Sequence, residues 1–275
     1  MNNIVEDLRN SISSHKFADI KKALSDFEVN KDNIETAKEL IEVLKSDKRK
    51  NVISIGIKYE KSLEKYNKEV ERVKLLYEFD KQRVKPGEYL AGVDEVGRGP
   101  LAGPIVAAAV VLDLDSLENI ILEINDSKKL TDHKREELAE IIKRNAIDYS
   151  ISLCDHNEID EKGIGVCNNL VFLNSVKTLK KVTPSVVLSD GYLVRNLDIY
   201  NEAVIKGDTK SASIACASII AKVFRDNIMK EYDEKYPNYD FVDNVGYGTS
   251  KHVNAIKKFG PCKIHRLSFL RNILK

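Results

Sequence analysis

The placement of proline and glycine divides this chain of 275 residues into two parts. Residues 1–85 contain no proline and a single glycine, Gly56, whereas Lys85-Pro86-Gly87 opens a remainder that holds all six prolines. Because both residue types interrupt helices, the first part can form long continuous helices. We therefore expect a helical N-terminal extension over residues 1–87 and a separate domain over residues 88–275.

The longest helix expected in the extension carries one apolar stripe. Its apolar residues recur at spacings of three and four: Tyr59, Leu63, Tyr66, Val70, Val73 and Tyr77. Shorter helices are expected over 5–14, 18–27 and 33–45, with a charged linker at 47–50. The extension carries no set of catalytic residues, so we expect it to support or extend the domain that follows.

Strands and helices alternate in the second part. Apolar runs predict strands over 89–94, 105–112, 149–153, 186–188 and 202–205. Helices are expected from Thr131, a plausible N-cap, and over 166–180 and 211–235. This alternation predicts an α/β domain over roughly residues 88–265.

The composition indicates a soluble globular chain. Apolar residues make up 43% and charged residues 32%, no apolar run approaches a membrane span, and the N-terminus lacks a secretory signal. The four cysteines form no CxxC and the five histidines are scattered, so we expect reduced thiols and no zinc site. We expect a cytoplasmic monomer that does not bind membranes.

One segment is basic although the net charge is only +1. From Lys251 to the C-terminus there are seven Lys or Arg and no acidic residue. Such a local basic segment favours contact with nucleic-acid phosphates. A solvated basic tail is the alternative that composition alone leaves open.

Four carboxylates fall at or near the ends of apolar runs. Asp94 and Glu95 follow the first run, Asp190 closes SVVLSD, and Asp208 follows EAVIKG. Functional groups converge at strand ends in open α/β sheets, and clustered carboxylates favour a hard cation such as Mg²⁺ or Mn²⁺ and phosphate chemistry. Each acid could instead form a turn or cap a helix, and adjacent strand residues point to opposite faces. The pattern alone leaves a metallonuclease and a phosphatase open.

Seven sequence blocks, in order, closely resemble those of type 2 ribonuclease H (ribonuclease HII). They are AGVDEVGRGPLAGP (91–104), DSKKL (126–130), SDG (189–191), IKGD (205–208), ASIIAKVFRD (217–226), GYGT (246–249) and HRLSF (265–269). The resemblance spans about 90–270, and the earlier residues resemble, less closely, the helical extension of some bacterial members. It implies an α/β, ribonuclease H-like fold, with a mixed sheet flanked by helices.

The resemblance also implies a reaction. Asp94, Glu95, Asp190 and Asp208 are its implied catalytic residues and metal ligands, for two Mg²⁺ or Mn²⁺ ions when substrate is bound. The implied substrates are RNA/DNA hybrids and duplex DNA with embedded ribonucleotides, as in ribonucleotide excision. Hydrolysis 5′ of the ribonucleotide would leave 3′-hydroxyl and 5′-phosphate ends.

Substrate contacts follow from the same resemblance. The turn Gly97-Arg98-Gly99 matches the element whose backbone reads the ribose 2′-hydroxyl, the group that distinguishes RNA from DNA. Tyr247 matches the tyrosine that packs on the neighbouring deoxyribose. The remaining expected substrate contacts are Ser127, Lys128, His265 and Arg266. Asp226 is expected to be structural, pairing with Arg225 or another neighbour.

Two alternatives compete with this assignment. A type 3 ribonuclease H shares much of the core and the carboxylates, but the Gly-Arg-Gly-Pro turn, Tyr247 and the helical extension favour type 2. A non-catalytic binder of RNA/DNA hybrids is disfavoured, because a pure binder gains nothing from four clustered acids facing a polyanion.

Overall fold

The computed structural model describes residues 2–116 and 119–274, which form two compact units. Unit 1 is Met1–Arg72 and unit 2 is Val73–Lys275. The division falls inside α4 (Lys50–Lys81). The proline-glycine break at 85–87 lies farther along, between α4 and the first strand. No helix of the described residues is long and apolar enough to cross a membrane.

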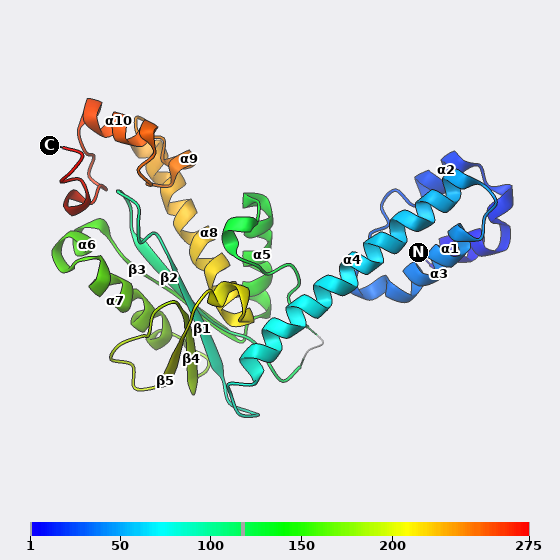
Figure 1. Ribbon diagram of the computed structural model, residues 1–275, viewed down its shortest axis with the longest axis horizontal. Coiled ribbons are helices and arrows are strands. Elements are labelled where there is room, and N and C mark those ends of the chain that lie inside the picture. The colour runs from blue at the N-terminus through cyan, green and yellow to red at the C-terminus, as the bar shows by residue number, and fades with distance from the viewer. Residues whose placement is uncertain (1, 117–118, 275) are drawn as a thin grey trace. The chain divides into compact units, whose positions relative to one another are not determined.

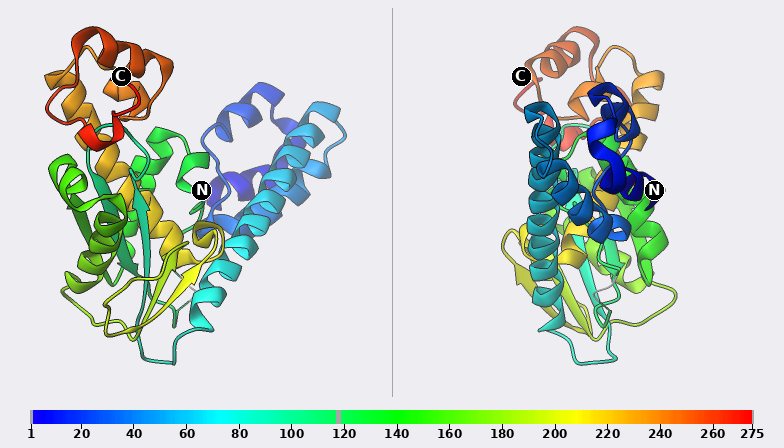
Figure 2. Two further views of the ribbon diagram at one scale, coloured as in Figure 1. Left: turned by 60° about the vertical axis from the view of Figure 1, so that its left-hand side comes forward. Right: turned by 90° about the vertical axis from the view of Figure 1, so that its right-hand side faces the viewer.

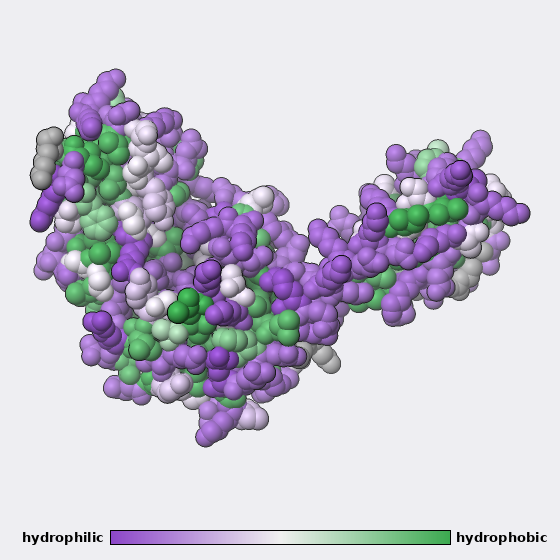
Figure 3. Space-filling model, viewed as in Figure 1, coloured by the Kyte–Doolittle hydropathy of each residue, from purple (hydrophilic) through white to green (hydrophobic). Residues whose placement is uncertain are grey.

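Unit 1 is helical, as the absence of proline predicts. It contains α1 (Asn2–Ser11), α2 (Phe17–Ala23), α3 (Ile34–Lys45) and the first part of α4, with short 3₁₀ turns at 12–14 and 31–33. Its core includes Ile20, Leu40, Leu44, Val52 and Tyr59. Hydrophilic residues cover most of its visible face in Figure 3.

The apolar stripe of α4 serves two different cores. Tyr59 packs in the core of unit 1, whereas Val73 and Tyr77 pack in a core of unit 2. The Tyr77 hydroxyl accepts the N–H of Ile121 at 3.1 Å, and the carboxylate of Asp80 accepts the N–H of Ser213 at 2.8 Å. The last turns of α4 are therefore part of the fold of unit 2.

Unit 2 is built on a five-stranded mixed sheet in the order β3-β2-β1-β4-β5 (Figure 1). Its strands are β1 (Leu90–Val96), β2 (Ile105–Val111), β3 (Asp148–Cys154), β4 (Val186–Asp190) and β5 (Tyr200–Val204). β1 pairs antiparallel with β2 and parallel with β4, and β5 continues in parallel. All five expected strands are present, with shifted ends.

Helices cover both faces of the sheet (Figures 1 and 2). Residues of α5 (Asp132–Asn145) and α8 (Ala212–Lys235) share one core with the sheet, and residues of α6 (His156–Lys162) and α7 (Ile164–Lys177) share another. Two further helices, α9 (Phe241–Asn244) and α10 (Ser250–Phe259), follow α8. Thr131 caps α5 as expected, accepting the N–H of Lys134 at 3.3 Å.

The central strands are buried because both faces are covered. β2 is buried along its whole length, and its alternating residues pack into the two cores. The backbone of α8 lies directly on β1: a Cβ at Gly92 would come within 2.2 Å of the carbonyl carbon of Ser213. This close approach fixes the start of α8 against the strand that carries Asp94.

Candidate active site

The register of the sheet places two predicted carboxylates side by side. β1 and β4 pair in parallel with Val93 opposite Ser189, so Asp94 and Asp190 are the next residues on neighbouring strands. Asp190 closes β4. Asp94 lies within β1 rather than at its end, because β1 continues to pair with β2 as far as Val96.

Asp208 is brought to the same edge by a 3₁₀ turn after β5, Gly207–Thr209. Asp190 Oδ1 accepts the N–H of Gly207 at 2.7 Å, which ties the end of β4 to this turn. Asp208 does not cap the helix that follows. Ser211 caps α8, with its hydroxyl accepting the N–H of Ile214 at 3.1 Å, so the carboxylate of Asp208 is left for another role.

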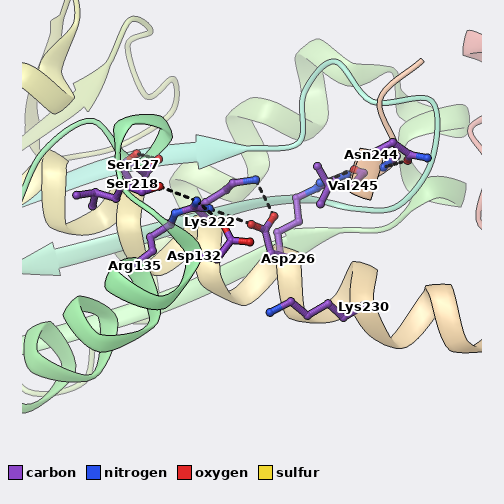
Figure 4. A network of polar contacts seen from close by, with 12 residues as sticks. Ser127, Asp132, Arg135, Ser218, Lys222, Asp226, Lys230, Asn244 and Val245 are labelled. Carbon is purple, nitrogen blue, oxygen red and sulfur yellow. Dashed lines mark hydrogen bonds and ion pairs between the residues drawn. The ribbon is translucent and has the colours of Figure 1, made fainter. Parts of the chain in front are cut away.

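Asp94 is buried against α8. Only 6% of it is exposed, its Oδ1 accepts the N–H of Glu95 at 2.7 Å, and Ser218 of α8 also hydrogen-bonds to it. The hydroxyl of Ser218 lies 3.0 Å from that of Ser127 (Figure 4). Because successive strand residues point to opposite faces, Glu95 leaves β1 on the side away from α8.

Burial and mutual repulsion raise the pKa values of three of these carboxyl groups. The pKa of Asp94 is raised by burial and by the charges of Glu95 and Asp190. Burial and Asp190 raise the pKa of Glu95 to about 7, against the lowering effect of Arg98. The pKa of Asp208 is also raised by burial and by Asp190. Four ionised carboxylates are thus unfavourable here without a cation.

The described residues contain no group of three or more His, Cys, Asp or Glu side chains arranged to hold a metal ion. Asp94 and Glu95 leave β1 on opposite faces, and one oxygen of Asp190 is directed at the main chain of Gly207. The oxygen-only donors suit a hard divalent cation, but the side chains would have to rotate to surround one.

The turn Gly97-Arg98-Gly99 is held from inside by Arg266. Its guanidinium donates to the carbonyl oxygens of Gly103 at 2.9 Å, Arg98 at 3.0 Å and Gly97 at 2.6 Å. Because these peptides are planar and trans, the N–H groups of Arg98 and Gly99 point away from the guanidinium. Neither N–H has an acceptor among residues 2–116 and 119–274. The turn therefore presents two free donors.

A second fully buried arginine, Arg225 of α8, holds the rest of the loop. It donates to the carbonyl oxygens of Pro104 at 2.9 Å, Val245 at 2.9 Å and Ala102 at 3.2 Å. Gly97 has φ +88°, and a Cβ there would lie 2.2 Å from Arg225 Nε. Glycine is required at this position by both the backbone conformation and the space.

Tyr247 lies beside the same turn. A Cβ at Gly99 would be 3.7 Å from Tyr247 Cε1, and Tyr247 is 43% exposed. Its main chain is fixed by a bond to Asn244 O at 2.8 Å and by His252 Nδ1, which donates to Tyr247 O at 2.9 Å. His252 Nε2 lies 3.0 Å from His265 Nε2, so a buried histidine pair supports this tyrosine.

Three expected substrate contacts lie inside the protein instead. His265 and Arg266 are 1% and 0% exposed, which contradicts direct phosphate contact, and they support Tyr247 and the 97–99 turn. Ser127 is also buried, with its hydroxyl on Ser218. Lys128 is exposed, and its charge lowers the pKa of Glu95, so it lies on the carboxylate side.

Asp226 is structural, with partners other than Arg225. It pairs with Arg135 of α5 at 3.1 Å and with Lys222 at 2.8 Å (Figure 4). The roles of Arg225, Ser218 and His252 were missed in the sequence. For Arg225 and Ser218 the only signal was their position within the matched block 217–226, and His252 lies outside every matched block. Nothing in a charge pattern shows which polar side chains face inward.

The chain is similar to known proteins along most of its length. A model described as "Ribonuclease HII" matches residues 91–272, and one described as "Ribonuclease HII N-terminal domain" matches residues 17–83. Ribonuclease HII of Clostridium perfringens (strain 13) is 60% identical over 274 residues, covering 100% of both chains. The Clostridium beijerinckii protein is 57% identical over 273 residues, with 98% of each covered.

A solved structure shows the same fold. Ribonuclease H2 from Pyrococcus horikoshii OT3 is 27% identical and superposes with a TM-score of 0.57, covering 68% of this chain and 97% of that one. The expected ribonuclease H-like fold is therefore confirmed, and the type 3 assignment is set aside. The chain belongs to the ribonuclease HII family and is an endonuclease of the ribonuclease H class.

Proposed function

We propose that this enzyme hydrolyses the RNA strand of RNA/DNA hybrids and incises 5′ of ribonucleotides embedded in duplex DNA. The observation that carries the proposal is the pair of free N–H groups at Arg98 and Gly99, in the loop that leaves the strand of Asp94. Two donors suit the oxygen of a 2′-hydroxyl, which deoxyribose lacks. A deoxyribonucleotide would leave both donors without a partner, which penalises it.

The residues that would hold Mg²⁺ or Mn²⁺ are Asp94, Glu95, Asp190 and Asp208. Support comes from their oxygen-only chemistry and from the raised pKa values of Asp94, Glu95 and Asp208. When bound, two such cations supply charge neutralisation at the phosphate and activation of water, giving 3′-hydroxyl and 5′-phosphate ends.

The protein's own groups orient the reactive side chains. Main-chain N–H groups hold one oxygen each of Asp94 and Asp190. Tyr247, which lies beside the 97–99 turn, would pack on the sugar next to the recognised ribose and so favour an RNA–DNA junction. Exposed Lys128 would contact a backbone phosphate. The four free thiols accord with the reducing, cytoplasmic setting that we propose.

The test is a cleavage assay on duplex DNA bearing one ribonucleotide, with Mg²⁺ or Mn²⁺. We expect a single cut 5′ of the ribonucleotide and none by the Asp94→Asn variant, which should remain folded. Cleavage confined to long RNA tracts would contradict single-ribonucleotide incision. Binding of the duplex without cleavage would contradict a catalytic role. Near-normal turnover by Asp94→Asn would contradict the assignment of the carboxylates as the active site.

A further inference from the structure

An open groove of about 750 Å³ lies on the face of unit 2 covered by α7. Its walls include Gly165, Val166 and Asn168 of α7 and, from the segment after β4, Tyr192 and Arg195, with Arg98 also lining it. We call this the α7 groove. Two arginines line it and no aspartate or glutamate does, so its charge suits an anion.

The helix at this groove begins without a side-chain cap. Gly163 is the N-cap residue of α7, which has 14 residues. Within the described residues, the N–H groups of Ile164, Gly165 and Val166 have no main-chain acceptor. Free N–H groups and the helix dipole favour a bound phosphate at such an end.

A buried amide without a partner is the second, independent observation. Asn168 is 6% exposed and lines the groove, and its Oδ1 is buried with no hydrogen-bond partner among the described residues. Leaving such a group unpaired is costly. The amide nitrogen of the same side chain is not fully enclosed and has no hydrogen-bond partner among the described residues, so Asn168 offers an N–H donor to a ligand as it stands.

At the groove, the main chain of Arg195 and the guanidinium of Arg98 each contact a neighbouring side chain. Asn169 fixes the main chain of Arg195 against α7, accepting its N–H at 2.7 Å and donating to its carbonyl at 3.2 Å. The Arg98 guanidinium lies 4.4 Å from the centroid of the Tyr192 ring. Gly191, which follows the carboxylate of Asp190, also lines the groove, so the groove adjoins the candidate active site.

We propose that the α7 groove is a subsite for one phosphodiester of the nucleic-acid substrate, distinct from the phosphodiester that is cut. The proposal rests on the proposed function for the identity of the strand. Phosphate oxygens would accept from the free N–H groups of α7, from Asn168 and from Arg195. Sugar or base would pack on Tyr192 and Val166, which are 48% and 52% exposed. Seating this phosphate would align the strand with the carboxylates.

The test combines a protein variant with a modified substrate. Single phosphates of a ribonucleotide-containing duplex are replaced, one position at a time, by uncharged methylphosphonates. Affinity is measured for the full chain carrying Asp94→Asn, with and without Arg195→Ala. The control is Lys177→Ala, which removes one exposed charge at the other end of α7. Arg195 and Lys177 are both exposed, so neither change should prevent folding.

We expect one position, away from the scissile bond, where methylphosphonate weakens binding roughly tenfold. At that position, methylphosphonate should hardly change the affinity of the chain that carries Arg195→Ala. It should weaken the chain that carries Lys177→Ala as much as it weakens the parent. If Arg195→Ala and Lys177→Ala change the effect of methylphosphonate to the same extent at every position, the proposed subsite is wrong. This holds even when the enzyme cuts its substrate normally. If no methylphosphonate position weakens binding, and millimolar nucleoside monophosphate competes with the duplex, the groove binds a free nucleotide. That result would also overturn the proposed subsite.

Discussion

Replacing Arg266 by methionine tests whether this buried guanidinium orients the N–H groups of Arg98 and Gly99. We call this the aiming role of Arg266. Methionine keeps much of the side-chain length but has no hydrogen-bond donor. The matched control is Arg225→Met. Both arginines are 0% exposed and each donates to three main-chain carbonyls, but only Arg266 bonds to Gly97 and Arg98.

The expected loss of stability is similar for the two variants. Three charge-assisted bonds contribute about 1.5–3 kcal/mol each. Burial, reinforced by the charge of Arg225, lowers the pKa of Arg266 to about 9, which shows that burying the charge offsets part of this gain. Burial likewise lowers the pKa of Arg225 to about 10. We expect the free energy of unfolding to fall by about 2–4 kcal/mol in either case.

The effect on sugar discrimination should separate the two variants. Without Arg266, the peptide planes of Arg98 and Gly99 would no longer be fixed, so the two neutral hydrogen bonds that we propose to the 2′-hydroxyl should weaken. At about 0.5–1.5 kcal/mol each, their loss reduces discrimination by roughly 5- to 150-fold. Arg225→Met should leave discrimination within about twofold of the parent, because its carbonyl partners lie outside the turn.

The assay compares dissociation constants for duplexes with and without one ribonucleotide, measured on chains that also carry Asp94→Asn. Thermal unfolding of the same chains gives the stability change. If Arg266→Met loses stability but keeps its preference for the ribonucleotide, then Arg266 only holds the loop. If Arg225→Met loses as much preference as Arg266→Met, general loosening of the loop is the cause. Either result refutes the aiming role.

Three further predictions follow from burial and contacts. Burial raises the pKa of Asp80 to about 6, so the folded state binds this proton more tightly than the unfolded state does, and the free energy of unfolding should fall as the pH rises from about 4 to about 6. Asp80→Asn should remove this fall, roughly 3 kcal/mol, in urea titrations across that range; an unchanged slope would exclude Asp80 as its cause. Tyr247→Ala should weaken cleavage at single ribonucleotides more than within long hybrids; equal loss on both would count against the sugar-packing role. A chain beginning at residue 88 should unfold at a lower temperature than one beginning at Val73, because it lacks the buried Tyr77; equal melting temperatures would contradict the placement of these turns in unit 2.

The sequence predicts the strands well because their apolar runs are bounded by glycine, proline or charged residues. It also predicts that the carboxylates converge at strand ends, but the parallel pairing of β1 and β4 that makes Asp94 and Asp190 neighbours comes from the structure. It does not predict the extent of β1, which depends on pairing with β2 as far as Val96. Nor does it reveal that Arg266 faces inward, because its acceptors are main-chain carbonyls rather than acidic side chains.

The chemistry of arginine explains why two of them are buried around one loop. The segment 97–104 leaves the sheet, so the carbonyls of Gly97, Arg98 and Gly103 have no main-chain partner among the described residues, yet the proposed recognition of the ribose requires N–H groups that remain unused. Guanidinium groups meet both needs, because they carry five donors and no acceptor and therefore satisfy carbonyls without occupying any N–H. Lysine has three donors at one point and cannot span the carbonyls of Gly97, Arg98 and Gly103. Arg266→Lys should thus fail to restore sugar discrimination, and restoration by lysine would show that charge alone is sufficient.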